Sequence, residues 1–351
     1  MIFILLMRSS FIFFFIIVFI PCIAQKKISA EKRGDYRLMF YNVENLFDIY
    51  DDPFKGDDDF TPGGKNTWNY DRYQNKLNNV YKVIIAIGGW TPPEIIGLCE
   101  VENRKVLNDL IENTPLKKAG YEIVHKESPD ERGIDVALLY LKKKFKPLSY
   151  QAIPVNFPDD PRDKTRDILM IKGIINKRDT LYVFINHFPS RSGGQARSEP
   201  KRMYTASLLR GKVDSIFACT VNPGIIIMGD LNDDPDNRSI MESLKVKITS
   251  DNIVHEELYN LSYRLFKEKK LGTLKYRGKW NLFDQIIISG SLLDKDRAVY
   301  TSEPDAHIFK QDNLLEKDPD GGMQLKRTYE GLKYKGGFSD HLPVYLDLWK
   351  R

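Results

Sequence analysis

The stretch Ile225–Pro235, IIIMGDLNDDP, joins a run of apolar residues directly to three aspartates and an asparagine. Consecutive isoleucines followed by methionine predict a buried strand. A buried strand does not need an acidic ending, whereas sites that bind metals or phosphates often have one. Asp230 and Asn232 are therefore the first candidates for functional residues.

Apolar runs rich in β-branched and aromatic residues recur along the chain and predict further strands. We expect strands at Arg37–Val43, Glu94–Cys99, Ile134–Leu141, Ile168–Ile175, Leu181–Asn186, Ile225–Met228, Asn281–Ser289 and Leu342–Leu348. Between some of them, apolar residues at helical spacing predict helices at Asp71–Ile87 and Pro200–Phe217. This mixture of elements indicates an α/β fold.

The chain is long enough to bury a large core, because it has 351 residues, of which 42% are hydrophobic and 12% aromatic. No internal repeat, low-complexity tract or Pro/Gly-rich linker divides it, which predicts a single domain over residues 30–351. The polar segments Ile49–Trp68 and Pro304–Gly337 are expected to be long surface loops. Loops of that length are often functional.

Charge and cysteine content limit the classes of function. The 53 basic and 48 acidic residues give a net charge of only +5, so a polyanion would have to be bound by a local patch. Beyond the N-terminal segment the cysteines are Cys99 and Cys219, so we expect no disulfide framework. Cys99 lies in an apolar run and is interpreted as a small buried hydrophobe.

The N-terminal segment, MIFILLMRSSFIFFFIIVFIPCIAQ, resembles a secretory signal peptide. Its apolar run from Phe11 to Ile20 is shorter than the roughly 20 residues that a membrane-spanning helix needs. We expect residues 1–24 to be the signal, with cleavage near Ala24 and export to the periplasm or beyond, and no stable membrane span in the mature chain. A retained anchor and a lipid attached to Cys22 are the alternatives, although Pro21 departs from the small residue of a lipoprotein motif.

Polar side chains stand at six places where predicted strands end. These are Asn42 and Glu44 in FYNVENLFD, Glu100 in IIGLCEVEN, His187 in INHFPSR, Asp230 and Asn232 in MGDLND, Asp284 in NLFDQIII, and Asp340 and His341 in GFSDHLPV. Each place alone has an ordinary explanation, since such carboxylates often cap helices or begin turns, and a histidine among apolar residues is often a hydrogen-bonded core residue. Six of them in one chain favour a functional site, and a buried, unpaired Glu44 would be costly.

A hard cation is the metal that these residues suit. Mg²⁺ binds carboxylate oxygens, often only one or two from the protein. Glu44 and Glu100 are the predicted ligands. Asn42 is two residues before Glu44, hence on the same side of the strand, and is a neutral oxygen donor. Mn²⁺ or Ca²⁺ are possible in place of Mg²⁺.

Two other kinds of metal site are not supported. Asp230, Asn232 and Asp234 have the first spacings of a calcium-binding EF-hand loop, but Pro235 and Met241 stand where that loop requires Gly and Glu. There is no HExxH motif or Cys/His cluster among only five histidines, which argues against zinc.

Taken together, these motifs resemble the endonuclease/exonuclease/phosphatase superfamily, which includes DNase I, exonuclease III-like abasic endonucleases, inositol polyphosphate 5-phosphatases and neutral sphingomyelinases. The similarity extends from FYNVENLFD to FSDHLPV in the family's order, and GDLND followed by SDH is specific for the superfamily, not for a substrate. The resemblance implies an exported, bacterial-type member with a DNase I-like fold. That fold is a four-layer sandwich in which helices flank two packed mixed β-sheets, with the site at one edge.

The resemblance also implies roles for the residues around the metal and the attacking water. Asn42, Glu44 and Glu100 fall on metal and phosphate positions, with Glu100 as the principal ligand. Asp230 falls on the residue that orients or deprotonates the water, and Asn232 on one that helps to hold the transition state.

Further roles concern the scissile phosphate and the leaving group. By resemblance, His341 contacts the phosphate and is oriented by Asp284, while Asp340 can also meet a metal. His187 matches a histidine of the DNase I and sphingomyelinase branches that protonates the leaving oxygen. The abasic-endonuclease branch lacks this histidine, so the resemblance leans away from DNA repair.

Arginines are the candidates for binding the rest of the substrate. Arg166, in KTRDILMIKG, matches a phosphate-contacting arginine of DNase I-like members, with a solvated strand terminus as the alternative. Arg191, Arg197 and Arg202, in SRSGGQARSEPKR, are either a phosphate track or a solvated loop and helix start.

The leading hypothesis is an exported, Mg²⁺-dependent phosphodiesterase, an endonuclease acting on DNA or RNA. The first alternative is a phosphatase or phospholipase C-like enzyme acting on phosphoinositides or sphingomyelin, because no basic stripe interleaved with aromatics indicates nucleic acid and the loop Asp51–Asp59 is acidic. The second is a catalytically inactive binding module, against which the full set of acids and histidines argues. No protein partner is indicated, and we expect a monomer.

Overall fold

The computed structural model describes residues 32–177, 179–248 and 252–351, of which Arg33–Arg351 form one compact unit. The predicted signal peptide and the predicted domain start at residue 30 lie outside these residues. None of the helices in the described ranges is long and apolar enough to cross a membrane.

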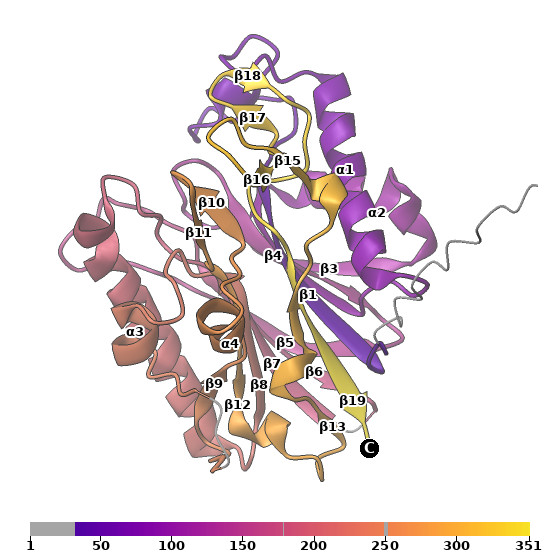
Figure 1. The fold of residues 1–351 in the computed structure, drawn as a ribbon, viewed down its shortest axis with the longest axis vertical. Coiled ribbons are helices and arrows are strands. Elements are labelled where there is room, and N and C mark those ends of the chain that lie inside the picture. Colours follow the sequence, from indigo (N-terminus) through magenta and orange to yellow (C-terminus); the bar gives the residue numbers. More distant parts are fainter. Residues whose placement is uncertain (1–31, 178, 249–251) are drawn as a thin grey trace, which may run out of the picture. The chain divides into compact units, whose positions relative to one another are not determined.

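Two large β-sheets form the centre of this unit (Figure 1). The first contains, in spatial order, β13 (Val299–Tyr300), β19 (Val344–Lys350), β1 (Tyr36–Leu46), β2 (Ile95–Val101), β4 (Asp135–Leu141) and β3 (Tyr121–His125), with β14 (Ala306–Ile308) also paired to β19. The second contains β5 (Phe145–Ile153), β6 (Ile168–Ile175), β7 (Asp179–His187), β8 (Gly224–Asp230), β12 (Asp284–Ser289) and β9 (Leu258–Asn260).

Helices and short hairpins complete the described structure. The α-helices are α1 (Tyr70–Gly88), α2 (Arg104–Glu112), α3 (Gln195–Cys219) and α4 (Ser262–Lys267). The hairpins are β10 (Leu274–Tyr276) with β11 (Lys279–Asn281), β15 (Leu315–Lys317) with β16 (Met323–Leu325), and β17 (Tyr329–Glu330) with β18 (Lys333–Tyr334). Helices α1 and α2 lie outside the first sheet and α3 outside the second (Figure 1).

The side chains of β8 show why its sequence is almost wholly apolar. Ile226 and Met228 pack between the two sheets, in a cluster with residues of β1. Ile225 and Ile227 point the other way and pack beneath α3. Because alternate residues of a strand face opposite sides, a strand covered on both sides needs apolar residues at every position.

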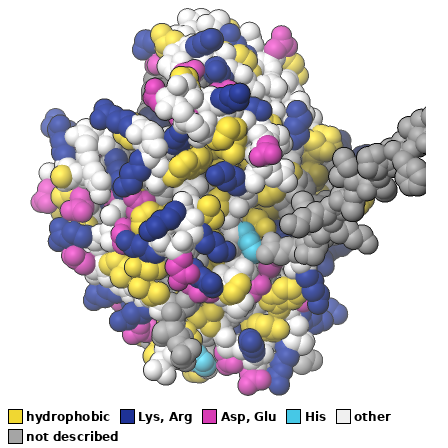
Figure 2. All heavy atoms as spheres, viewed as in Figure 1, with side chains coloured by type: hydrophobic (Ala, Val, Ile, Leu, Met, Phe, Trp, Pro, Cys, Tyr) yellow, Lys and Arg dark blue, Asp and Glu magenta, His cyan; other side chains and the backbone are white. Residues whose placement is uncertain are grey.

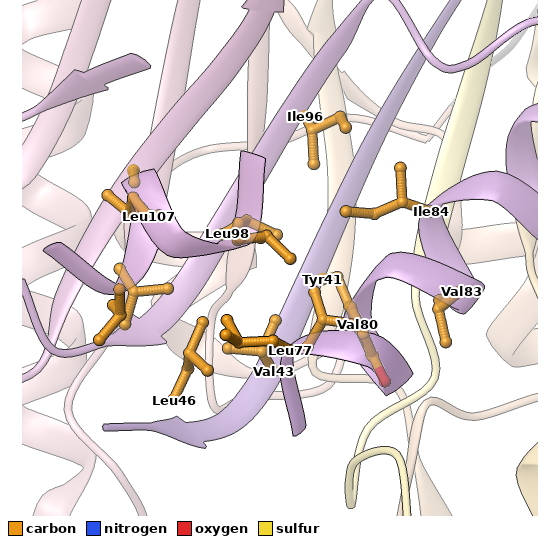
Figure 3. Packing of buried hydrophobic residues seen from close by; sticks show 14 of the residues in the cluster. Tyr41, Val43, Leu46, Leu77, Val80, Val83, Ile84, Ile96, Leu98 and Leu107 are labelled. Carbon is orange, nitrogen blue, oxygen red and sulfur yellow. The ribbon is translucent and has the colours of Figure 1, made fainter. Parts of the chain in front are cut away.

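Helix α1 covers the first sheet in the same manner. Its residues Leu77, Val80 and Ile84 recur at helical spacing and are fully buried. They pack against Tyr41 of β1 and Leu98 of β2 (Figure 3). Two sheets packed on each other with helices on both outer faces confirm the predicted α/β fold with mixed sheets and flanking helices.

Some element boundaries differ from those predicted. Helix α3 begins at Gln195, before Pro200, and the side chains of Ser198 and Arg202 donate hydrogen bonds to the Gln195 carbonyl in its first turn. The strands β3 and β5 were not predicted. Strand β5 is an edge strand that contains Pro147 and a register shift, which removes the alternating pattern by which strands are recognised.

A prediction about stability concerns Gly229, which pairs with Asn186 on β7. A Cβ atom on Gly229 would lie 2.6 Å from the Asn186 Cβ and 2.7 Å from its carbonyl oxygen. We expect Gly229→Ala to lower the free energy of unfolding by about 1–3 kcal/mol, because a packed core must shift to admit the methyl group. Chemical denaturation measures this change.

The matched control is Gly211→Ala. Gly211 lies on α3, and beyond its chain neighbours and the backbone of its own helix no described heavy atom lies within 4 Å of the position that an alanine methyl group would take. Alanine should therefore leave stability unchanged or raise it by up to about 1 kcal/mol. Equal effects of the two substitutions would contradict the proposed crowding at Gly229.

Candidate active site

The predicted site residues come together because of the directions of six strands. Strands β1 and β2 are parallel, as are β7 and β8, so Asn42, Glu100, His187 and Asp230 lie toward the carboxyl ends of their strands. Strands β12 and β19 run antiparallel to β8 and β1, so their beginnings reach the same edge. Asp284 begins β12, and His341 precedes β19.

Asp230 is at the centre of the site and is 1% exposed. Its Oδ1 accepts a hydrogen bond from the backbone N–H of Asn232 (2.9 Å), and its Oδ2 accepts one from Nδ2 of Asn42 (3.0 Å). Burial raises its pKa to about 6, while the charge of His341 opposes this rise. The carboxyl group is therefore largely ionised at neutral pH, in a fixed orientation and able to accept a proton.

Asp284 and His341 form a buried pair beside Asp230. Nδ1 of His341 lies 2.7 Å from Oδ2 of Asp284, and its Nε2 lies 3.7 Å from Oδ2 of Asp230. Burial disfavours the charged imidazole, but Asp284 and then Asp230 outweigh it, so the pKa of His341 is raised well above its ordinary value. A cationic imidazole of this kind can bind a phosphate oxygen.

His187 also lies beside carboxylates, but its pKa is shifted in the opposite direction to that of His341. Its Nε2 lies 3.8 Å from Oε1 of Glu100 and 3.7 Å from Oδ2 of Asp230. Burial, and then the charges of Arg166 and Arg132, hold its pKa well below the ordinary value. The free protein thus holds His187 neutral, without the extra proton that a general acid donates, and its predicted acid role stays a prediction.

The end of β1 is irregular, which separates Asn42 from Glu44. Glu44 has a φ angle of 53° and Glu100 one of 59°, and the register of β1 with β2 shifts here. Asn42 directs its Nδ2 toward Asp230 and Glu100, whereas its Oδ1 accepts the N–H of Glu44. The simple two-residue alternation expected for Asn42 and Glu44 therefore does not apply, and the Asn42 oxygen is directed at the backbone.

Glu44 has protein partners that the sequence did not reveal. Its Oε2 accepts the N–H of Thr328 (2.6 Å), and its Oε1 lies 3.4 Å from Nε of Arg327. The ammonium group of Lys76 lies 3.9 Å from Oε2. Burial, followed by the charge of Asp340, nevertheless raises the pKa of Glu44 to about 7.

Arg327 also binds Asp340, with Nη2 2.8 Å from Oδ2, and so joins Asp340 to Glu44. The segment that carries Arg327 was predicted only as a long loop, so its arginine had no visible partner in the sequence. Lys76 was detectable, because it lies three residues after Tyr73 and four before Val80, on the buried face of α1. A lysine on an apolar helix face is unusual without a partner.

The predicted substrate arginines are engaged with the protein itself. Arg166 is 7% exposed, and its guanidinium pairs with Asp130 (3.0 Å) and donates to the Phe188 carbonyl (2.7 Å). Arg191 donates to the Asn232 carbonyl (2.8 Å) and pairs with Asp233 (3.1 Å). Both side chains hold loops of the site in place, and their contact with substrate stays a prediction.

Arg202 fits neither interpretation of its loop, because it is neither part of a phosphate track nor a solvated residue of a helix start. It is fully buried, and its Nε lies 2.8 Å from Oδ2 of Asp233. Asp234 accepts the N–H of Leu282 (2.8 Å). The acidic residues after β8 thus divide their tasks: Asp230 faces the site, and the next two aspartates hold the loop.

A basic pocket of about 590 Å³ adjoins the site on the side of Arg166. Its lining contains five basic side chains (Arg132, Lys164, Arg166, Arg197 and Lys201) and three acidic ones (Asp130, Glu131 and Asp163). Arg132, which sequence reasoning missed, lies between this pocket and the site, with Nη2 3.9 Å from Oε1 of Glu100. The loop of Arg132 is held by Asp130, whose Oδ1 accepts the Arg132 N–H (3.0 Å).

The residues present fit a hard divalent cation. They offer carboxylate oxygens without a thiol, and the raised pKa values of Asp230 and Glu44 reflect negative charge that burial leaves poorly stabilised. Asp230, Asp284 and His341 form one group whose ligand atoms lie within 4.8 Å of one another. Glu100 adds an oxygen beside Asp230, close to His187.

This fold and this arrangement of acids and histidines define a class of phosphoester hydrolases. Residues 37–350 match the Endonuclease/Exonuclease/phosphatase family, and the chain belongs to that family. Members of the family are metal-dependent. No curated protein matches the chain.

Solved structures share the fold at low sequence identity. The catalytic domain of human Nocturnin with bound sulfate is 16% identical with a TM-score of 0.52, over 90% of this chain and 94% of that one. A family protein from Bacteroides thetaiotaomicron is 14% identical with a TM-score of 0.55, over 90% and 98%. TDP2 of D. rerio, complexed with a single-strand DNA product, is 13% identical with a TM-score of 0.54, over 89% and 98%.

Proposed function

We propose that this protein is an exported, Mg²⁺-dependent phosphodiesterase that cleaves DNA or RNA internally. The observation that carries the proposal is the arrangement of Asp230 between the two histidines, His187 and His341, next to a pocket rich in basic side chains. Such a site can activate water and neutralise the scissile phosphate, and the pocket can bind the phosphates next to it in the substrate. The signal peptide predicted from residues 1–24 is the basis for export.

The proposed mechanism assigns one task to each side chain. Asp230, held by Asn42 and the Asn232 N–H, orients the attacking water and accepts its proton. His341, kept cationic by Asp284, binds a non-bridging oxygen of the phosphate and stabilises its growing negative charge. Asn232 is fixed close by, because its Nδ2 donates to the Phe188 carbonyl (3.0 Å).

The metal would be held by Glu100, with Glu44 and Asp340 as further carboxylates. When bound, Mg²⁺ would supply positive charge to the phosphate oxygens. Glu100 is oriented for this by the Asn45 N–H, which donates to its Oε2 (3.0 Å). Arg327 holds Glu44 and Asp340 close to each other.

The basic pocket supports a substrate with several phosphates. Lys and Arg side chains are mixed with acidic ones over the face shown in Figure 2, so this face has no broad field of one sign. The basic excess in the pocket is therefore local, as the small net charge requires. An inositol polyphosphate fits the same excess and is the second candidate, whereas a sphingomyelin head group has only one phosphate and a cation.

The substrate class is tested by activity toward closed circular plasmid, single-stranded DNA, RNA, an inositol polyphosphate and sphingomyelin. Cleavage of the closed circle requires an endonuclease. Rapid turnover of the inositol phosphate or sphingomyelin, with all nucleic acids left intact, would refute the proposal. Recovery of processed protein outside the cytoplasm, beginning near residue 25, tests export.

Binding of nucleic acid should weaken steeply with salt. Each phosphate neutralised on a single strand contributes roughly −0.7 to the slope of log K against log salt. Lys164 and Arg197 are exposed and have no acidic ion-pair partner among the described residues. We expect the double substitution Lys164→Ala with Arg197→Ala to reduce the magnitude of this slope by roughly 1.4.

The control is Lys143→Ala. Strand β4 begins at Asp135, close to the loop of Arg132, and ends at Leu141, two residues before Lys143. The length of the strand therefore places Lys143 roughly 20 Å from that loop. A salt titration of binding by fluorescence anisotropy should give the wild-type slope for this variant. An unchanged slope for the double variant would show that the basic pocket does not bind phosphates of the nucleic acid.

A further inference from the structure

A second groove adjoins the site, between the hairpin β10–β11 and the segment Arg191–Gln195. Its volume of about 790 Å³ is within the range of roughly 300–1,000 Å³ that is common for small-ligand pockets. Asn232 is part of its lining, so the groove opens beside the catalytic residues. None of the other residues with a proposed catalytic task lines it, which leaves it for a part of the substrate other than the scissile phosphate.

The hairpin presents an aromatic ring and two cations to this groove. Tyr276 is 60% exposed, and the Arg277 guanidinium lies 5.3 Å from the centre of its ring. Arg277 and Gly278 both have positive φ angles, 48° and 77°, as expected for the two central residues of a tight hairpin turn. Neither Arg277 nor Lys279 forms an ion pair with an acidic group in the described ranges, so both cations are available to an anion.

The hairpin is joined directly to the catalytic pair of Asp284 and His341. Leu274 forms a β-bridge with His341, and the Thr273 carbonyl accepts the N–H of Leu342 (2.7 Å). Oγ1 of Thr273 accepts the N–H of Asp284 (3.2 Å). The Tyr276 ring therefore extends from a strand that is fixed to the active site.

The basic pocket and this groove, whose linings share Ser192 and Gly193, differ in chemistry. The basic pocket is lined by five cations, and its aromatic residue, Phe157, is only 5% exposed. The groove has an exposed aromatic ring with a basic rim. We propose that this groove binds a nucleobase of a single-stranded nucleic acid, stacked on Tyr276, while adjacent phosphates enter the basic pocket. This inference rests on the proposed nuclease function and defines its substrate further.

The proposal names a single strand because a base can stack on an aromatic side chain only if it is not paired and stacked within a duplex. Aromatic platforms of this kind accept any base, since every base has a π-face. The protein should therefore bind a strand that carries bases more tightly than an abasic strand, with little difference among the four bases.

The test compares two oligonucleotides of equal length and charge, one of thymidine nucleotides and one of abasic nucleotides. Binding is measured by fluorescence anisotropy in full-length protein carrying Asp230→Asn, so that neither is cut. We expect the protein to bind the base-bearing strand about 5- to 150-fold more tightly, the range that loss of one base–aromatic stack produces. Adding Tyr276→Ala should bring this ratio close to one, and Tyr276→Phe should keep it.

The matched control is Tyr150→Ala. Tyr150 is 55% exposed on β5, an edge strand that β6, β7 and β8 separate from β12, and its loss should leave the ratio unchanged. If the affinity ratio stays high after Tyr276→Ala, the base site is wrong. A ratio near one in the protein that keeps Tyr276 would also overturn the base site, provided that the wild-type protein still cleaves nucleic acid. Failure to bind or cleave either strand, with bis-p-nitrophenyl phosphate still hydrolysed, would overturn the nuclease proposal as well.

Discussion

Asp230→Asn is expected to lower kcat by about 10²- to 10⁴-fold, the usual contribution of a positioned proton-transfer group. The substitution conserves shape and can keep one acceptor for the Asn232 N–H, but it removes the ionisable oxygen that accepts a proton from water. The pKa of about 6 means that this oxygen carries its negative charge in most molecules at neutral pH. Steady-state kinetics on a small phosphodiester measure the loss.

Two measurements separate a chemical effect from a folding effect. Thermal unfolding of the Asp230→Asn variant should remain cooperative, and its KM should change much less than its kcat. Asp296→Asn is the control, since the Asp296 side chain is 83% exposed and should not affect turnover. A kcat within about threefold of wild type would remove Asp230 from proton transfer and leave it as a turn residue.

The elements of the fold were predictable where a run of apolar residues has clear ends. Strand β6 has the predicted bounds, Ile168–Ile175, because apolar residues there are bounded by polar ones. The interval Asn281–Ser289 was predicted as one strand but is divided, since β11 ends at Asn281 and β12 begins at Asp284. Phe283 lies between them, with the Arg191 guanidinium 4.4 Å from the centre of its ring, and this contact depends on a loop far away in sequence.

The meeting of candidate site residues was predictable where polar residues stand at the ends of apolar strands. Asp230, Asp284 and His341 meet as expected, because strand direction alone brings them to one edge. The surroundings of Glu44 were not predictable, since Arg327 and Thr328 come from a segment almost 300 residues later in the chain, at separations of 283 and 284. Long-range ion pairs leave no periodic pattern in a sequence.

Arg202 shows the same limit in a different way. A run of arginines near a predicted phosphate site suggests phosphate binding, but Arg202 forms a buried ion pair with Asp233 instead. The sequence contained the acid, and nothing in it indicated which arginine would be its partner. An ion pair buried to this extent is retained only with close geometry, so neither residue is free to bind substrate.

Removal of divalent cations is expected to abolish turnover. The carboxylates of the site have no thiol or cluster of imidazoles to hold a soft metal, and such oxygen ligands suit Mg²⁺ or Mn²⁺. Dialysis against EDTA should therefore remove activity, and Mg²⁺ or Mn²⁺ should restore it. Full turnover in chelator, with the protein shown to be free of metal, would end the metal-dependent interpretation.

Glu100→Gln tests the proposed metal site more directly, because it changes one proposed ligand and leaves the other carboxylates in place. The Asn45 N–H can still donate to the remaining carbonyl oxygen, so the loop should keep its conformation. Since even an outer partner of a metal ligand is typically worth about 10- to 100-fold in affinity, we expect Mn²⁺ to bind at least about tenfold more weakly by calorimetry. The control is Glu122→Gln, on the exposed face of β3, which should bind Mn²⁺ like wild type. In the part of the chain that the structure describes, Glu122 forms an ion pair only with the exposed Lys142. Equal affinities for the Glu100 variant and wild type would show that Glu100 is not a ligand, and would leave Glu44, Asp340 or the Asp230 group as the metal-binding residues.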